Sequence, residues 1–84
     1  MLMAKRILAV EDERDILECL DIILSSSGYL VETSLTGLNI EQKILDFNPD
    51  LILLDIMLGS IDGREICRAI KTNRETRHIP VIMV

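Results

Sequence analysis

The chain has 84 residues, of which 49% are hydrophobic and only 2% aromatic, and its formal net charge is −5. This length predicts one small domain, residues 1–84, with an aliphatic core. The negative charge argues against a direct nucleic-acid partner and the lack of an apolar run of about 20 residues argues against a membrane helix, so we expect a cytoplasmic protein.

The first predicted element is a strand at residues 6–10, RILAV, which has no polar alternation after its first residue. Such a run is typical of a strand that is covered on both faces in a parallel sheet. From Arg14 to Ser27 the apolar period becomes helical, and Gly28 ends the helix. The side chains predicted to share its buried stripe are Ile16, Leu20, Ile23 and Leu24, with Leu17 at the margin.

Strands and helices continue to alternate after Gly28. Residues 29–34 alternate apolar and polar side chains, which suits an edge strand, whereas residues 51–54, LILL, are apolar throughout and are predicted to be buried on both faces. The remaining elements are a helix at 38–46 with Ile40, Ile44, Leu45 and Phe47 as its stripe, a helix at 64–72 burying Ile66 and Ile70, and a strand at 78–84. This order predicts right-handed crossovers and an α/β fold with a doubly wound parallel sheet.

Acidic residues follow the two fully apolar strands of this predicted sheet. Glu11 and Asp12 come directly after the first, and Asp55 comes directly after LILL. In a doubly wound sheet, ligands bind in the crevice at the carboxyl ends of the strands. If these two strands are neighbours, three carboxylates converge on one cleft.

Three converging carboxylates raise one another's pKa unless a cation lies between them. Oxygen ligands that leave room for water and a phosphate suit Mg²⁺, and an aspartate can attack phosphorus to form an acyl phosphate. The cluster therefore indicates phosphoryl chemistry. Taken singly, however, an acid such as Asp12 or Glu13 has a plainer interpretation as a cap of the following helix.

Three segments resemble the receiver domain of bacterial two-component response regulators. They are ILAVEDERDI, PDLILLDIMLGSIDG and HIPVIMV, and the resemblance covers essentially the whole chain in the right order and spacing. It implies a flavodoxin-like receiver fold that is incomplete, because the sequence stops after the fourth strand. It also implies a signalling module and not an enzyme.

The resemblance assigns roles to individual residues. Asp55 corresponds to the phosphoacceptor, which takes a phosphoryl group from a sensor histidine kinase or a phosphotransfer protein. Glu11, Asp12, Asp55 and the backbone carbonyl of Met57 correspond to the Mg²⁺ ligands. No catalytic residue beyond Asp55 is implied.

Two departures from the family pattern stand out. Gly59 occupies the position where the family usually has proline, while the usual glycine at Gly63 is retained. The sequence also stops at Val84, before the hydroxyl residue and the lysine with which receivers bind the phosphoryl group. We expect this to uncover apolar surface and to favour a homodimer or larger assembly through the sheet face or edge.

Two other functions remain open. The chain could serve only as a structural or dimerising half-domain without competent phosphorylation. It could also be a hydrolase with an aspartyl nucleophile, like the haloacid-dehalogenase phosphatases, but these place a second Asp two positions later. Met57 occupies that position, which argues against a hydrolase.

Overall fold

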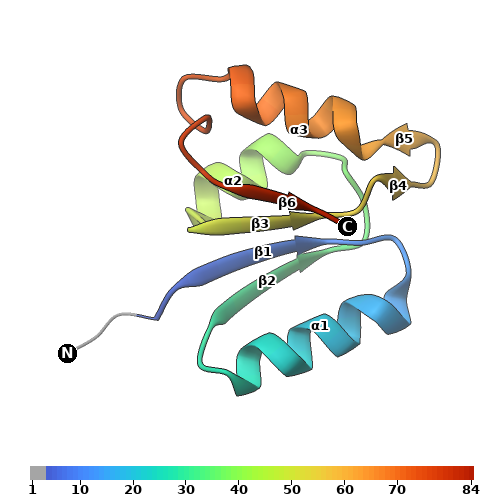
Figure 1. Cartoon of the computed structure of the whole chain (residues 1–84), viewed down its shortest axis with the longest axis vertical. Coiled ribbons are helices and arrows are strands. Elements are labelled where there is room, and N and C mark those ends of the chain that lie inside the picture. The colour runs from blue at the N-terminus through green and yellow to red at the C-terminus, as the bar shows by residue number, and fades with distance from the viewer. Residues whose placement is uncertain (1–3) are drawn as a thin grey trace.

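The computed structural model describes residues 4–84 as a parallel sheet with helices on both faces (Figure 1). The four strands of this sheet lie in the order β2-β1-β3-β6, which confirms the predicted doubly wound α/β fold and the predicted edge position of β2. The elements of the main sheet and its helices are β1 (Arg6–Val10), α1 (Arg14–Ser26), β2 (Leu30–Ser34), α2 (Ile40–Phe47), β3 (Leu51–Leu54), α3 (Gly63–Thr72) and β6 (Val81–Met83). A short antiparallel hairpin of β4 (Met57–Leu58) and β5 (Ile61–Asp62) lies between β3 and α3.

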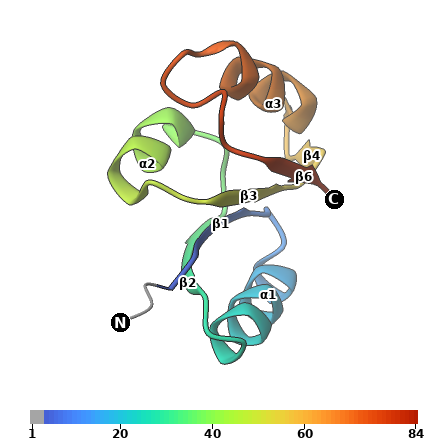
Figure 2. The same ribbon diagram turned by 60° about the vertical axis from the view of Figure 1, so that its left-hand side comes forward.

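The main hydrophobic core lies between the sheet and the helices α2 and α3, which cover the same face (Figure 2). Alternate residues of β1 and β3 point into it, because successive side chains of a strand face opposite sides. Ile44 of α2 and Ile70 of α3 pack over it, as the helical periodicity predicts, but Leu45, also predicted in the stripe of α2, is 51% exposed because it lies on the outer side of the helix. The buried members of this cluster are Leu8, Val10, Ile40, Ile44, Ile52, Leu54, Leu58, Ile66, Ile70 and Ile79.

Helix α1 covers the opposite face, and its buried stripe differs from the predicted one. Leu17, which we placed at the margin, is the buried residue of this helix, whereas Ile16 and Ile23 are 51% and 61% exposed. The reason is the position of the helix: α1 packs against β1 and β2, so only the side toward these strands is covered. The side that carries Ile16 and Ile23 is left in solvent.

The position of α1 also changes the prediction that β3 is covered on both faces. Ile52 and Leu54, which point toward α2 and α3, are buried, but Leu51 and Leu53 are only half-buried. Ile82 of β6 lies beside Leu53 in the register and is 49% exposed. The sheet therefore has one sealed face and one open apolar face.

Element boundaries shift from the predicted ones where the backbone has a special conformation. Helix α2 begins at Ile40 and not at residue 38, because Asn39 has a left-handed φ of 58°. The same helix ends at Phe47, where Asn48 has a left-handed φ of 54°. Strand β6 is shorter than predicted and begins after Pro80, which has no N–H to donate to the sheet.

Candidate functional site

The ends of β1 and β3 meet at one edge of the sheet, as the predicted topology requires. Val10 pairs with Leu54 in the parallel register, and the Asp55 N–H continues the ladder by donating to the Val10 carbonyl at 3.0 Å. On the other side, the Glu11 N–H donates to the Ser34 carbonyl at 3.0 Å. Glu11 and Asp55 are thus held beside each other by backbone hydrogen bonds.

Three carboxylates converge at this edge, which confirms the predicted cluster. Glu11, Asp12 and Asp55 each offer an oxygen, and these oxygens lie within 4.8 Å of one another. Their exposure differs: Glu11 is only 6% exposed, Asp55 is half-buried and Asp12 is exposed. The arrangement is therefore an acidic pocket whose inner member is shielded from water.

The shielded position of Glu11 changes its acidity. Burial raises its pKa to about 7, and a hydrogen bond with Asp55 and the charges of Asp55 and Asp12 act in the same direction. Within residues 4–84, neither of the two ion pairs, Arg64–Asp62 and Arg68–Glu65, involves this cluster. The cluster therefore lacks a protein cation to neutralise it, and its all-oxygen donor set fits Mg²⁺, a hard cation.

The loop after Asp55 supplies N–H groups to two of the acids. The Asp55 carboxylate accepts a hydrogen bond at 3.1 Å from the Met57 N–H, and Asp12 Oδ2 accepts one at 3.0 Å from the Gly59 N–H. The Met57 contact is a local turn of the kind that Asp commonly forms with the N–H two residues later, whereas the Gly59 contact depends on the β4–β5 hairpin and is not predictable from the sequence. The available sequence signal was Gly59 itself, since a glycine after a short apolar segment often marks a tight turn, and its φ in the structure is +63°.

Gly63 approaches the backbone of the predicted acceptor from the sealed face. Its N–H donates to the Ile56 carbonyl at 2.6 Å, and a Cβ at this position would collide with the backbone carbonyl of Asp55. Gly63 also begins α3, whose N-cap Asp62 accepts a hydrogen bond from the Arg64 N–H at 2.9 Å. Hydrogen bonds from Arg64 lower the pKa of Asp62. Only a residue without a side chain fits between α3 and Asp55.

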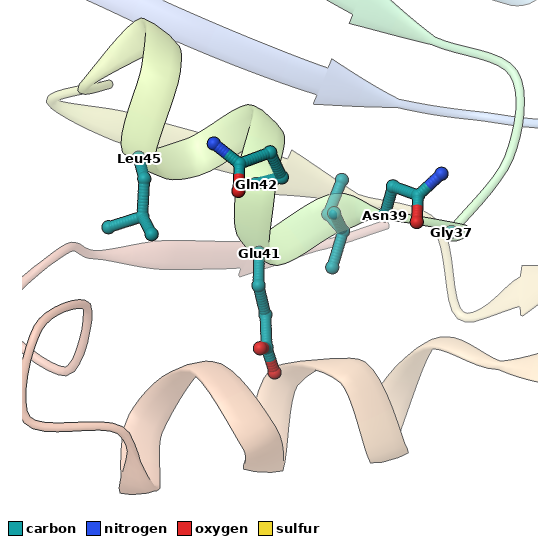
Figure 3. A pocket seen from close by; sticks show the side chains of 6 residues that line it. Gly37, Asn39, Glu41, Gln42 and Leu45 are labelled. Atoms are coloured by element: carbon teal, nitrogen blue, oxygen red, sulfur yellow. The ribbon is translucent and has the colours of Figure 1, made fainter.

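An apolar hollow of about 330 Å³ opens beside the acids on the face that carries α1. It is lined by Glu11, Ile16, Leu20, Asp55 and Val84. A second hollow, of about 440 Å³, lies at the start of α2 and shares no residue with the acidic cluster (Figure 3). The single acid among its lining residues, Glu41, points toward α3, so this hollow brings no reactive groups together.

Comparison with known proteins agrees with this geometry. A family model described as the response regulator receiver domain matches residues 7–84. The chain is similar to the DNA-binding dual master transcriptional regulator RpaA of Synechocystis, with 34% identity over 79 residues. That match covers 94% of this chain but only 33% of the relative, so the chain spans about one third of its length.

Solved structures show the same likeness. The N-terminal domain of a response regulator receiver protein from Methanoculleus marisnigri is 38% identical, with a TM-score of 0.87 over 93% of this chain and 63% of that one. The signal receiver domain of a signal transduction histidine kinase from Syntrophus aciditrophicus is 36% identical, with a TM-score of 0.89 over 96% of this chain and 61% of that one. In the described part of this chain, no helix has the length and apolar character to cross a membrane.

Proposed function

The chain belongs to the response regulator receiver domain family, and from that membership we propose that Asp55 accepts a phosphoryl group from a sensor histidine kinase or a phosphotransfer protein. A receiver domain of a two-component system is a signalling phosphoacceptor and not a catalytic enzyme. The observation that carries the proposal is the convergence of Glu11, Asp12 and Asp55 within 4.8 Å. We also propose a cytoplasmic location, since receiver domains typically act there.

The residues of the site divide the proposed reaction between them. An Asp55 oxygen attacks the phosphorus of a phosphohistidine, so that a P–O bond forms, the P–N bond breaks and the imidazole leaves with its electron pair. The Met57 N–H orients the Asp55 carboxylate through one oxygen and leaves the other for the attack. Glu11, Asp12, Asp55 and the Met57 carbonyl would hold Mg²⁺, which supplies neutralisation of the transferring phosphoryl oxygens.

A small phosphodonor tests this proposal without knowledge of the kinase. The protein is incubated with acetyl phosphate and Mg²⁺, and intact mass is measured before and after. We expect one phosphoryl adduct that hydroxylamine releases, as it does an acyl phosphate. Asp55→Asn, checked for folding by circular dichroism, should give none. A folded wild-type sample without an adduct would remove phosphoacceptor function from this chain.

A second candidate function is self-association without competent phosphorylation, and the open apolar face favours it. Ile16, Ile23 and Ile82 all expose about half of their surface or more on this side of the sheet. We propose that two copies bury this face against each other, since exposed apolar patches mark interaction sites. Sedimentation at micromolar concentration should then give a dimer that Ile82→Asp dissociates, and a wild-type monomer at every concentration contradicts it.

A further inference from the structure

We propose that Gly59 is a positioning residue for the cation site. Its backbone N–H holds Asp12 Oδ2 and leaves the other carboxylate oxygen of Asp12 free for a cation. This inference rests on the proposed function, because that function gives Asp12 its role as a Mg²⁺ ligand. It adds a group that contacts neither the cation nor the phosphoryl group.

Asp12 needs an external contact to keep one orientation. It is exposed, and it lies in the connection between β1 and α1, outside any helix or strand. Among the hydrogen bonds made within residues 4–84, the 3.0 Å contact with Gly59 is the one that its carboxylate accepts. Hydrogen bonds of this kind orient metal ligands, and losing them typically weakens metal binding.

Glycine is favoured at residue 59 by backbone conformation and not by space. Gly59 and Ser60 form the two-residue loop that joins Leu58 to Ile61, and Gly59 has a φ of +63°. Because Ser60 has a negative φ, the loop has the φ pattern of a type II′ turn, in which glycine takes the first central position. No atom lies within 4 Å of a Cβ built on Gly59.

The contact also joins the cation site to the hairpin. Met57, which pairs with Asp62 across β4 and β5, donates its own N–H to Asp55. The N–H groups of Met57 and Gly59 therefore hold two of the three acids from one short loop. Asp12, a proposed cation ligand, and Asp55, the proposed phosphoacceptor, are thus both hydrogen-bonded to the same loop.

Three variants of residue 59 distinguish the effect of losing its N–H from the effect of changing the conformation of the turn. Gly59→Asn keeps the N–H and tolerates a left-handed φ, whereas Gly59→Pro removes the N–H and fixes φ near −65°. Chemical synthesis with glycolic acid in place of Gly59 turns the N–H into an ester oxygen and keeps a flexible backbone. The glycolate form keeps the test valid even if the proline variant does not fold.

The first measurement is Mg²⁺ affinity, obtained from amide chemical shifts during a MgCl₂ titration. We expect Gly59→Asn to bind within about twofold of the wild type, and the proline and glycolate forms to bind about tenfold more weakly. The second measurement is amide hydrogen exchange of Gly59 in EDTA. Asp12→Ala should speed exchange at Gly59 and leave the Gly28 amide, which donates to the Ser25 carbonyl, unchanged.

The outcomes separate this proposal from the function on which it rests. Equal Mg²⁺ affinity in the wild type and a folded glycolate form overturns the positioning role and leaves the phosphoacceptor proposal intact. An amide exchange rate at Gly59 that is the same in the wild type and in Asp12→Ala also overturns the positioning role alone. A wild-type protein that takes up neither Mg²⁺ nor a phosphoryl group overturns the proposed function and the positioning role together, whatever the exchange data give.

Discussion

The two faces of the sheet differ in how completely their apolar side chains are covered. Toward α2 and α3, the alternate residues of β1 and β3, such as Leu8 and Ile52, are fully buried. Toward α1, Ile7 and Ala9 of the central strand are buried, but Ile82 at the edge is half exposed. The contrast shows that two helices seal one face while a single helix placed over β1 and β2 leaves β3 and β6 open.

The acidic cluster lies where these two faces meet. From the sealed face, Gly63 packs against the backbone of Asp55. From the open face, the apolar hollow reaches Glu11 and Asp55 between Ile16 and Val84. Packing against Gly63 thus fixes the backbone of Asp55, the proposed acceptor, on one side, while the carboxylates remain accessible from the other.

The largest expected effect is on the free energy of unfolding, when a side chain is truncated on each face of the sheet. Ile52→Ala removes a side chain that is 0% exposed and should lower the free energy of unfolding by about 2–5 kcal/mol, because a cavity remains. Ile82→Ala removes the same atoms from a side chain that is 49% exposed and should cost less than about 1 kcal/mol. Urea unfolding measures both losses. Equal losses in the two variants would contradict the difference in coverage between the two faces.

The next effect is a pH dependence at the boundary between the faces. In Mg²⁺-free buffer, the Glu11 pKa of about 7 lies above its ordinary value of 4.5, so the folded protein binds a proton that the unfolded chain releases. The stability that this bound proton contributes is fully present below pH 4.5 and is lost as the pH rises through 7, by about 1–3 kcal/mol after allowance for solvent screening. Urea unfolding from pH 4.5 to 8 measures this loss.

Glu11→Gln is the control for the pH dependence. The amide does not titrate, so the decline in stability between pH 4.5 and 8 should flatten in this variant. Added Mg²⁺ should stabilise the wild type more at pH 8 than at pH 5, because the cation binds the ionised carboxylate. A wild-type profile as flat as that of Glu11→Gln would show that Glu11 is not shielded.

The smallest effect compares two glycines. Gly63→Ala places a Cβ against the Asp55 carbonyl and should cost about 1–3 kcal/mol. Gly28→Ala meets no atom within 4 Å, but its φ of +96° makes it cost about 1–2 kcal/mol as well. Only Gly63→Ala should slow phosphorylation by acetyl phosphate, because only it displaces Asp55. Equal rates in the two folded variants would contradict a role of the sealed face in fixing the acceptor.

Sequence periodicity predicted the parts of the fold that extend over several residues. The runs at 6–10 and 51–54 correctly indicated two adjacent strands, although β3 is buried on one face only, and their ends brought Glu11 and Asp55 together. The burial of Leu17 in place of Ile16 was not predictable, because it depends on which strands α1 covers. Helical periodicity states which side chains share a face but does not place that face on the sheet.

The β4–β5 hairpin escaped prediction for a different reason. Strands of two residues are too short to display any period, and the side chains of Leu58 and Ile61 resemble those of an ordinary apolar loop. The hydrogen bond between Gly59 and Asp12 joins residues 47 positions apart and appears only once this hairpin is formed. The acids could be identified from the sequence, but the Gly59 N–H that orients Asp12 could not.

The shortness of the hairpin has a consequence for local dynamics. Two strands of two residues form few ladder hydrogen bonds, and an isolated hairpin of this size is marginally stable in water. Leu58 is the one buried side chain of the two strands and would leave the core on opening, so opening costs more free energy than for an isolated hairpin but less than unfolding of the sheet. Circular dichroism will not detect this opening, whereas amide exchange at Leu58 and Ile61 will. The geometry around Asp55 therefore has its own stability, separate from that of the domain that carries it.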